Sequence, residues 1–211
     1  MVRLDPAGFP FVVAALVLAG VGGALATWTL AIPFVALSAF FVFFFRDPDR
    51  YPPSGTGDDA VLSPADGRVL VAGAASPEAA PPGQWQQISI FLSPIDVHVN
   101  RVPVSGRVTR VTFTPGRFLP AYRPDAATAN ERSEIWIDHR GQTIVARQIV
   151  GVLARRVVCR IGSGVQVTAG DRFGIMKFGS RMDVFVPPSA IVVVSVGQKV
   201  HGGETVIAML H

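Results

Sequence analysis

The chain begins with a long apolar segment. Residues 11–45 are almost wholly apolar, and Thr27–Thr29 and Pro33 interrupt the run in its middle. Because a helix that spans a bilayer needs about 20 residues, the run is too long for one span and short for two. We therefore expect two helices, over residues 9–26 and 30–45, each about 24 Å long and folded together as a membrane hairpin.

The charges around this segment predict its orientation. Arg3 precedes it, and Arg46 and Arg50 follow it. Positive charge at both ends places both on the cytoplasmic side, so we expect residues 1–45 to anchor the chain in the cell membrane with the remainder in the cytoplasm. A cleavable signal peptide is the alternative, because Ala24–Ala26 resembles a cleavage site. Against it, the apolar run continues for about twenty residues further.

The pattern changes after the apolar segment. Residues 46–60 are rich in proline, aspartate and glycine, which end a helix and predict a linker. Beyond them, short strand-like runs are separated by turns, so residues 61–211 are predicted to form a mainly β domain. The predicted strands are 67–72, 87–92, 106–113, 134–138, 143–150, 157–161, 183–186 and 190–196.

A weak internal repeat refines the expected fold. Residues 167–176 can be laid over residues 200–209, with a valine, a glycine, an acidic residue and a methionine at matched offsets. Each glycine suits a tight turn between two short strands. The two copies resemble the paired halves of the biotinyl/lipoyl hammerhead, so we expect an internally two-fold β-sandwich.

Composition narrows the classes of partner. The formal net charge is +4, and arginine supplies most of the positive charge because Lys177 and Lys199 are the only lysines. Arginine binds phosphate and carboxylate through a planar fork, so the charge fits an anionic membrane surface or nucleic acid. Few aromatic residues alternate with these arginines, which disfavours nucleic acid. The single cysteine, Cys159, excludes an internal disulfide, and no paired Cys/His spacing predicts a metal site.

The dipeptide Gly179–Ser180 is a candidate site of self-cleavage. It precedes an alternating run that suits a strand with Ser180 at its first position. In a strained turn the serine hydroxyl can attack the preceding carbonyl, so that the amide becomes an ester, and elimination and hydrolysis then leave a pyruvoyl group. Glycine leaves the carbonyl accessible and tolerates unusual backbone angles. Taken alone, the dipeptide is more simply interpreted as an ordinary turn.

Two further stretches carry candidate chemistry. Asp66 lies within Ser-Pro-Ala-Asp-Gly-Arg-Val, in a turn before a predicted strand, and residues 96–103 read Asp-Val-His-Val-Asn-Arg-Val-Pro. Asp96 and His98 are two residues apart and would share one face of a strand. His98 could act as an acid or base near neutral pH. An Asp-Gly turn and a structural histidine are the alternatives.

Together, Ser-Pro-x-Asp-Gly-x-Val, Asp-x-His-x-Asn-Arg-x-Pro and Phe-Gly-Ser resemble the short form of the phosphatidylserine decarboxylase proenzymes, over roughly residues 46–211. The resemblance implies self-cleavage between Gly179 and Ser180, with Ser180 becoming a covalent pyruvoyl cofactor. It also places Asp66 and Ser180 in an Asp-His-Ser set for that cleavage. Longer members carry a second histidine that falls on Arg101 here, so the cleavage base is His98 or a water positioned by Arg101.

The resemblance also implies decarboxylation of phosphatidylserine to phosphatidylethanolamine. The pyruvoyl carbonyl captures the serine amine and accepts the electrons released with carbon dioxide, so no dissociable cofactor is needed. We expect His98 to protonate the α-carbon, and Arg101 and Asn100 to bind the substrate. The expected partners are a phospholipid, the membrane, the chain's own cleaved fragment and further copies of the chain, without nucleic acid.

A biotinyl/lipoyl-type carrier domain is the alternative function. Met176-Lys177 resembles the Met-Lys hairpin that carries the modified lysine of biotinyl carriers, which makes Lys177 the residue to modify. Such carriers need neither Asp66 nor His98, nor an apolar hairpin.

Overall fold

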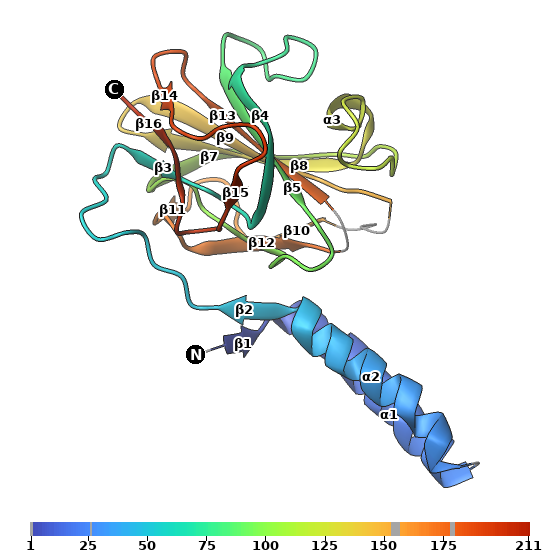
Figure 1. Ribbon diagram of the computed structural model, residues 1–211. Helices are drawn as coiled ribbons and strands as arrows, with labels where there is room; N and C mark the ends of the chain where they lie inside the picture. Colours follow the sequence, from blue (N-terminus) through green and yellow to red (C-terminus); the bar gives the residue numbers. More distant parts are fainter. Residues whose placement is uncertain (1, 26, 153–156, 178–179) are drawn as a thin grey trace. The chain divides into compact units, whose positions relative to one another are not determined.

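The computed structural model describes residues 2–25, 27–152, 157–177 and 180–211. Within it the chain divides into two compact units, Met1–Asp49 and Arg50–His211. Figure 1 shows that the first unit is built around two long helices and the second around β-strands. We describe each unit by itself.

The first unit is an antiparallel pair of apolar helices closed by a short ribbon. Helix α1 (Phe9–Leu25) packs along α2 (Trp28–Phe44), close to the predicted helices. Strands β1 (Val2–Leu4) and β2 (Arg46–Pro48) pair antiparallel at the base of the hairpin, and η1 (Pro6–Gly8) leads into α1. Residues 46–48, expected as the start of a linker, therefore form a strand.

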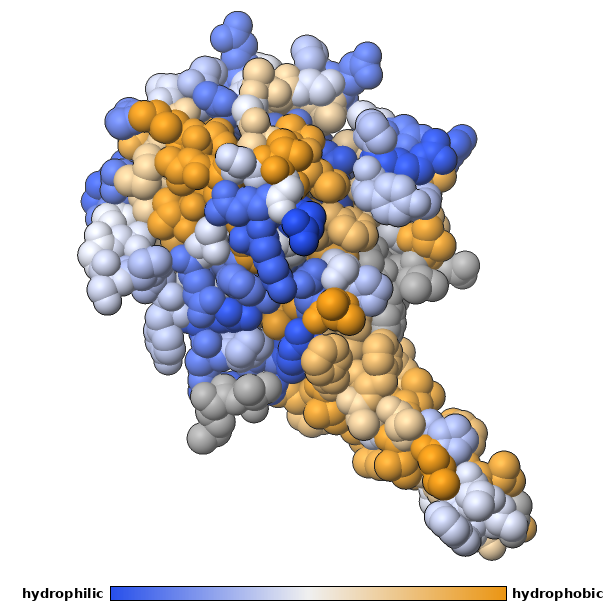
Figure 2. All heavy atoms as spheres, viewed as in Figure 1, coloured by the Kyte–Doolittle hydropathy of each residue, from blue (hydrophilic) through white to orange (hydrophobic). Residues whose placement is uncertain are grey.

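The helices of this unit are apolar around their whole circumference. Figure 2 shows hydrophobic residues along both helices, and large side chains such as Leu25 and Trp28 are 83% and 73% exposed. Among the described residues, Pro6–Leu25 is long and apolar enough to cross a membrane, whereas α2 is shorter, with 17 residues. A helix that is apolar all round is typical of a segment surrounded by protein or lipid.

The second unit is mainly β, as predicted. Its largest sheet has the strand order β11-β7-β8-β9-β13-β5-β4-β15, and two three-stranded sheets have the orders β10-β12-β6 and β14-β16-β3. The elements of this unit are β3 (Ala60–Leu62), β4 (Gly67–Ala74), β5 (Gln86–Leu92), β6 (Val99–Arg101), β7 (Gly106–Thr114), α3 (Ala126–Ala129), β8 (Arg132–His139), β9 (Gln142–Ile149), β10 (Val157–Cys159), β11 (Gln166–Val167), β12 (Arg172–Met176), β13 (Ser180–Val186), β14 (Ile191–Val192), β15 (Lys199–Val200) and β16 (Val206–Met209).

All three sheets of this unit contribute to one hydrophobic core. The large sheet is curled (Figure 1), and the core includes Ile90 of β5 and Val184 of β13, together with Phe173 of β12 and Ile207 of β16 from the smaller sheets. Alternate residues of a strand point to opposite faces of a sheet, so the central strands β5 and β13 each direct one face into this core.

The predicted strands correspond to observed ones, and the shortest strands were missed. The eight predicted runs fall on β4, β5, β7, β8, β9, β10, β13 and β14. The runs missed β3, β6, β11 and β15, which contain two or three residues, too few to show an alternating pattern, and they also missed β12 and β16, of five and four residues. Residues 116–131 contain the four-residue helix α3.

The internal repeat corresponds to two similar strand pairs. In each copy a short strand, β11 or β15, is followed by a turn and a second strand, β12 or β16, and both turns contain a glycine with positive φ, +88° at Gly170 and +75° at Gly203. Strands β11 and β15 lie at opposite edges of the large sheet, and β12 and β16 are each central in a three-stranded sheet. The two-fold relation and the hammerhead resemblance stay predictions.

The prediction that Asp96 and His98 share one face of a strand was wrong. Strand β6 begins only at Val99. The Asp96 carboxylate accepts hydrogen bonds from the backbone N–H and the hydroxyl of Ser93, at 2.8 and 2.7 Å, and so closes a turn. Side-chain capping of this kind competes with strand formation, which separates the two side chains.

Candidate active site

Ser180 lies at the beginning of the central strand β13, as predicted. Strand β13 pairs with β5 on one side and β9 on the other, and Ser180 lies opposite Leu92 of β5. Its side chain is fully buried, and its Oγ has no hydrogen-bond partner among the residues that the structure describes. Such an unsatisfied buried hydroxyl is uncommon and calls for an explanation. Gly179, the other half of the predicted cleavage site, lies outside the described residues.

His98 lies just before β6, beside the end of β12. The backbone N–H of Met176, the last residue of β12, donates to the carbonyl of His98 at 3.3 Å. His98 is fully buried, and its Nδ1 lies 2.9 Å from the carbonyl oxygen of Asp96. Because a carbonyl can only accept, this contact places the proton of the neutral ring on Nδ1 and leaves Nε2 as a lone-pair acceptor.

Asp66 lies in the turn before β4, where three groups surround its carboxylate. The Nη2 of Arg50 donates to Oδ2 at 3.0 Å, and the backbone N–H of Gly202 donates to Oδ1 at 2.8 Å. The Nδ1 of His201 lies 3.6 Å from Oδ2. The histidine beside Asp66 is therefore His201, which follows β15 in the sequence.

Asp66 and Ser180 belong to the same end of the large sheet. Strand pairing places Arg68 of β4 beside Phe91 of β5, and Phe91 beside Arg181 of β13. Asp66 therefore comes just before β4 where Ser180 begins β13, with β5 between them. Neighbouring strands are about 4.8 Å apart, so the two backbones are separated by about 10 Å, a distance that two side chains and a proton carrier can bridge.

Comparison with known proteins decides the family. Residues 37–208 match the phosphatidylserine decarboxylase family. A phosphatidylserine decarboxylase proenzyme of Granulibacter bethesdensis is 44% identical, with 97% of this chain and 84% of that protein aligned. Proenzymes of the same name from Nitrosomonas europaea and Mycobacterium leprae are 38% and 44% identical, each over 97% of this chain and over 94% and 87% of their own lengths.

The chain belongs to the phosphatidylserine decarboxylase family. It is therefore a decarboxylase, and the relatives that it matches are named as proenzymes. The alignments cover the apolar N-terminal segment as well as the β unit. The alternative function, a carrier domain modified at Lys177, is not supported by these matches.

In this decarboxylase both predicted substrate-binding residues are buried in protein contacts. Asn100 is fully buried, and its Oδ1 accepts a hydrogen bond from Nε2 of Gln148 at 2.8 Å. Arg101 is 4% exposed, and its Nη1 donates to the carbonyl of Gly170 at 3.0 Å. These contacts hold β6 within the fold, and a role for Asn100 and Arg101 in substrate binding stays a prediction.

Arg123 forms an exposed fork with Asp125, with distances of 2.9 and 2.8 Å. This hydrogen bonding to Arg123 lowers the pKa of the Asp125 carboxyl. The single cysteine, Cys159, is partly buried, and burial raises the pKa of its thiol. Because the thiolate is the nucleophilic form, Cys159 is a poor competitor for the chemistry of Ser180.

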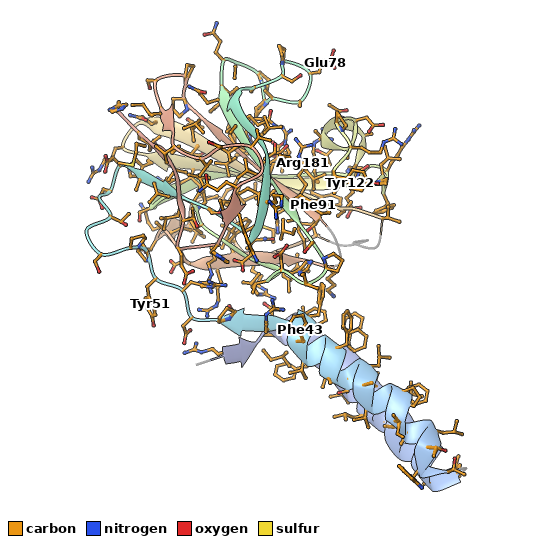
Figure 3. All side chains as sticks on the ribbon, in the orientation of Figure 1. Phe43, Tyr51, Glu78, Phe91, Tyr122 and Arg181 are labelled. Carbon is orange, nitrogen blue, oxygen red and sulfur yellow. The ribbon has the colours of Figure 1, made fainter. Side chains whose placement is uncertain are left out.

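A cavity of about 420 Å³ lies at the same end of the sheet, and two positively charged side chains line it. It is lined by Gly67, Arg68, Phe91, Ser93, Ile95, Asp96 and Lys199. Phe91 also forms an edge-to-face contact with Tyr122, with ring centroids 6.0 Å apart, and Figure 3 shows the two rings near Arg181. The cavity combines aromatic surface with positive charge.

Sequence reasoning missed Arg50 and Glu204. The Nη1 of Arg50 donates to Oε2 of Glu204 at 2.5 Å, while its Nη2 holds Asp66. Arg50 had been assigned to the linker and Glu204 to the repeat. No local signal could have brought them together, because 154 residues separate them in the sequence.

Proposed function

We propose that the chain is a precursor that cleaves itself between Gly179 and Ser180 and then decarboxylates phosphatidylserine to phosphatidylethanolamine with a pyruvoyl group made from Ser180. The observation that carries this proposal is the fully buried Ser180 Oγ at the start of β13. The chain belongs to a family whose members are named as proenzymes, which supports processing of the chain.

The environment of Ser180 favours reaction of its hydroxyl. A buried polar group without a hydrogen bond destabilises the folded chain by about 1–3 kcal/mol. No hydrogen bond to the described residues therefore has to be broken before the Ser180 hydroxyl reacts. Attack of Oγ on the Gly179 carbonyl forms an ester and breaks the peptide C–N bond, and the hydroxyl proton goes to the Ser180 nitrogen. Elimination then releases residues 1–179 with a free carboxylate, and hydrolysis of the new terminus releases ammonia and leaves the pyruvoyl group.

We propose roles in moving protons for His98 and Asp66. His98 offers Nε2 as an acceptor because its Nδ1 faces the Asp96 carbonyl. We assign to His98 the protonation of the substrate α-carbon, with a share in the cleavage step. Asp66, at the same end of the sheet, orients or stabilises the group that takes the Ser180 proton.

A pyruvoyl carbonyl, once formed, supplies an electron sink for the carbon–carbon bond that breaks during decarboxylation. The chain must hold the substrate's phosphate and carboxylate, both of which are anionic. Arg68 and Lys199 line the 420 Å³ cavity at this end of the sheet, and Phe91 adds apolar surface. Because Phe91 pairs with Arg181, this cavity lies on the face opposite the Ser180 side chain, so we propose it only as a site for the lipid phosphate and not for the reacting amine.

The two products of cleavage should stay together. The small product would begin with β13, which lies between β5 and β9 of the large product. Strands β15 and β16 of the small product also pair with β4 and β3 of the large one. Separation would require breaking the middle of a sheet, so residues 180–211 would remain bound. Association of whole copies of the chain is a further expectation.

We also propose that α1 and α2 anchor the enzyme in the cell membrane with the β unit on the cytoplasmic side. This is supported by the apolar surface of both helices and by arginines at both ends of the hairpin, Arg3 and Arg46. An anchored enzyme reaches a substrate that is itself a membrane lipid. Similarly, the matched strand pairs β11–β12 and β15–β16 support an internally two-fold sandwich of hammerhead type.

Intact mass spectrometry of the purified chain tests the proposal. We expect two products in place of the 22.4 kDa precursor, with the smaller one blocked by a pyruvoyl group at residue 180. Borohydride added with phosphatidylserine should link the lipid amine to the small product only. A single uncut chain that still decarboxylates the lipid would contradict the proposal.

A further inference from the structure

Two buried amide side chains, Asn100 of β6 and Gln148 of β9, connect the large sheet to the sheet β10-β12-β6, and we call them the amide bridge. The Nε2 of Gln148 donates to Oδ1 of Asn100 at 2.8 Å, and both residues are fully buried. Gly174 of β12, which pairs with Asn100, leaves room for the bridge, because a Cβ on this residue would come within 2.9 Å of the Gln148 Nε2. The fold therefore accommodates this polar contact inside its core.

The amide bridge leaves one hydrogen-bond donor and one acceptor unused. The Nδ2 of Asn100 and the Oε1 of Gln148 are buried and have no hydrogen-bond partner in the part of the chain that the structure describes. Turning both amides round exchanges the two residues, but one NH₂ group and one carbonyl oxygen are still left over. Unsatisfied buried amide groups are uncommon and call for an explanation.

The amide bridge lies near Ser180, on the same face of the large sheet. Gln148 pairs with Met182, whose side chain is in the core, and Ser180 precedes Met182 by two residues on that face. Gln148 and Ser180 are thus diagonal neighbours on adjacent strands, and such residues are about 7–8 Å apart, within reach of a long side chain. The unsatisfied atoms of Ser180, Asn100 and Gln148 therefore gather at one end of the core.

The unused donor and acceptor match the amino-acid end of phosphatidylserine. One carbon of this lipid carries both an amine, which can donate a hydrogen bond, and a carboxylate, which can only accept. A neutral amide also suits a carboxylate that is about to leave, because its negative charge is lost as carbon dioxide forms. A cation would stabilise the bound carboxylate more than the transition state and so slow the reaction, whereas an amide orients the carboxylate with a smaller penalty.

We propose that the amide bridge binds the amino-acid end of the substrate beside residue 180. The Nδ2 of Asn100 donates to the carboxylate, and the Oε1 of Gln148 accepts from the amine. Phosphatidylethanolamine has the same amine but no carboxylate, so the bridge distinguishes the substrate from the product. Self-cleavage removes the nitrogen of residue 180 and thereby makes room for the amine. The inference rests on the proposed function, in which residue 180 becomes the pyruvoyl group.

Borohydride trapping with two lipids tests this inference. The self-cleaved, full-length protein is mixed with detergent micelles that contain a low fraction of either phosphatidylserine or phosphatidylethanolamine. Borohydride reduces the bond between the lipid amine and the pyruvoyl carbon, and mass spectrometry of the small product measures the rate at which each lipid is linked. Electrophoresis of the same samples measures cleavage of the precursor, so that processing and lipid binding are scored separately.

The two members of the bridge should give different results. Asn100→Asp keeps the oxygen that accepts from Gln148 but replaces the donor, so we expect about a 100-fold slower trapping of phosphatidylserine and less than about a threefold change for phosphatidylethanolamine. Gln148→Met removes the acceptor for the amine that both lipids carry, so both should be trapped about tenfold more slowly. Gln87→Met is the matched control and should keep both rates, because Gln87 is a buried glutamine on the outer face of the sheet.

The ratio of the two trapping rates decides between binding and a structural role. A structural role would slow both lipids by one factor in every variant, and that result, or unchanged rates, would overturn the inference. A selective loss of phosphatidylserine trapping in Gln148→Met instead of Asn100→Asp would support the same bridge with both amides turned round. If a variant is not cleaved, Asn100→Ala and Gln148→Leu decide on the same criterion, and loss of cleavage in these as well would overturn the inference.

The wild-type protein separates this inference from the proposed function. If the wild-type chain remains uncut, or links neither lipid to residue 180, the proposed function itself fails. If it is cut and traps both lipids while the variants keep its ratio of rates, only the role of the amide bridge is lost.

Discussion

Polar side chains on the two faces of strand β13 differ in their hydrogen bonding. On the outer face, Arg181 and Asp183 form a buried fork, with Nε–Oδ1 and Nη2–Oδ2 distances of 2.6 and 3.1 Å. Ser89 and Gln87 of β5 complete this network. On the core face, Met182, Val184 and Val186 are apolar, and Ser180 is the one polar side chain among the described residues of that face.

The difference separates polar groups that stabilise the fold from the one to which we assign chemistry. The outer network is buried and its members bond to one another, which is the condition under which buried charges are tolerated. The Ser180 hydroxyl lies on the same strand, one residue away, and has no such partner among the described residues. A fold able to satisfy Arg181 and Asp183 leaves the neighbouring hydroxyl free to react.

The largest expected effect comes from Ser180→Ala. Without the hydroxyl, cleavage should be lost completely, and the protein should remain one chain without decarboxylase activity. Because the substitution removes an unsatisfied buried hydroxyl, the free energy of unfolding should stay the same or rise by about 1 kcal/mol. Electrophoresis, lipid analysis and urea unfolding measure the three quantities. A loss of stability of several kcal/mol would show that the hydroxyl is structural.

Ser180→Cys and Ser180→Thr refine this result. Cysteine can cleave through a thioester and, if elimination follows, form the same pyruvoyl group. Threonine keeps the hydroxyl but crowds it with a methyl group, so we expect slow cleavage at most and a ketobutyryl terminus. Mass spectrometry of the small product distinguishes the two termini. Identical rates for serine and threonine would argue against tight packing around the hydroxyl.

The next largest effect concerns the opposite face. Asp183→Ala leaves the buried Arg181 guanidinium without its counter-ion, and breaking a buried pair in this way costs about 3–5 kcal/mol. Urea unfolding of the variant in the uncut Ser180→Ala background measures the loss, which avoids comparison between cut and uncut chains. In the cleavage-competent background, molecules that fold should still cut themselves.

The double variant Arg181→Met with Asp183→Leu is the control for charge. Replacing both members of a buried ion pair by apolar residues of similar volume is often neutral or stabilising. We therefore expect it to recover most of the stability lost in Asp183→Ala. If the double variant folds but is no longer cleaved, the outer face contributes to the chemistry, and the distinction between the two faces fails.

The smallest effect is expected from Ser89→Ala. The hydroxyl of Ser89 accepts hydrogen bonds from Arg181 Nη2 and Gln87 Nε2, both at 2.9 Å. Loss of this hydroxyl should lower the free energy of unfolding by only about 1.5 kcal/mol, because Asp183 still pairs with the Arg181 guanidinium. The cleavage rate should equal that of the wild type. A slower rate with an unchanged free energy of unfolding would connect this network to Ser180.

The fold was predictable from the sequence where local patterns are long. The apolar run predicted both helices, and alternation predicted the central strands, including the start of β13 at Ser180. Strands of two or three residues contain too few residues to show an alternating pattern. The turn closed by Asp96 was missed because its bonds to Ser93 depend on side-chain capping, which an alternating pattern conceals.

The candidate site was predictable only in part, for a similar reason. Motifs carried by neighbouring residues pointed to Ser180, His98 and Asp66. The partners of Asp66 could not be found in this way, because pairing of β15 with β4 brings His201 to it, and Arg50 reaches it from the segment before β3. Contacts between distant segments are a property of the folded sheet, and composition or spacing does not record them.

The central position of β13 also has a consequence for the order of events during synthesis. Strands β5 and β9 leave the ribosome first, and until β13 arrives each presents an unpaired edge to the other and to neighbouring chains. The serine at the start of β13 thus reaches its place together with the segment that closes both edges. A cut made earlier would separate β13 from β5 and β9, the strands that it pairs with, and leave residues 1–179 prone to aggregation. If the chain cleaves itself as proposed, a bond at the start of the last central strand makes completed assembly a condition for activation.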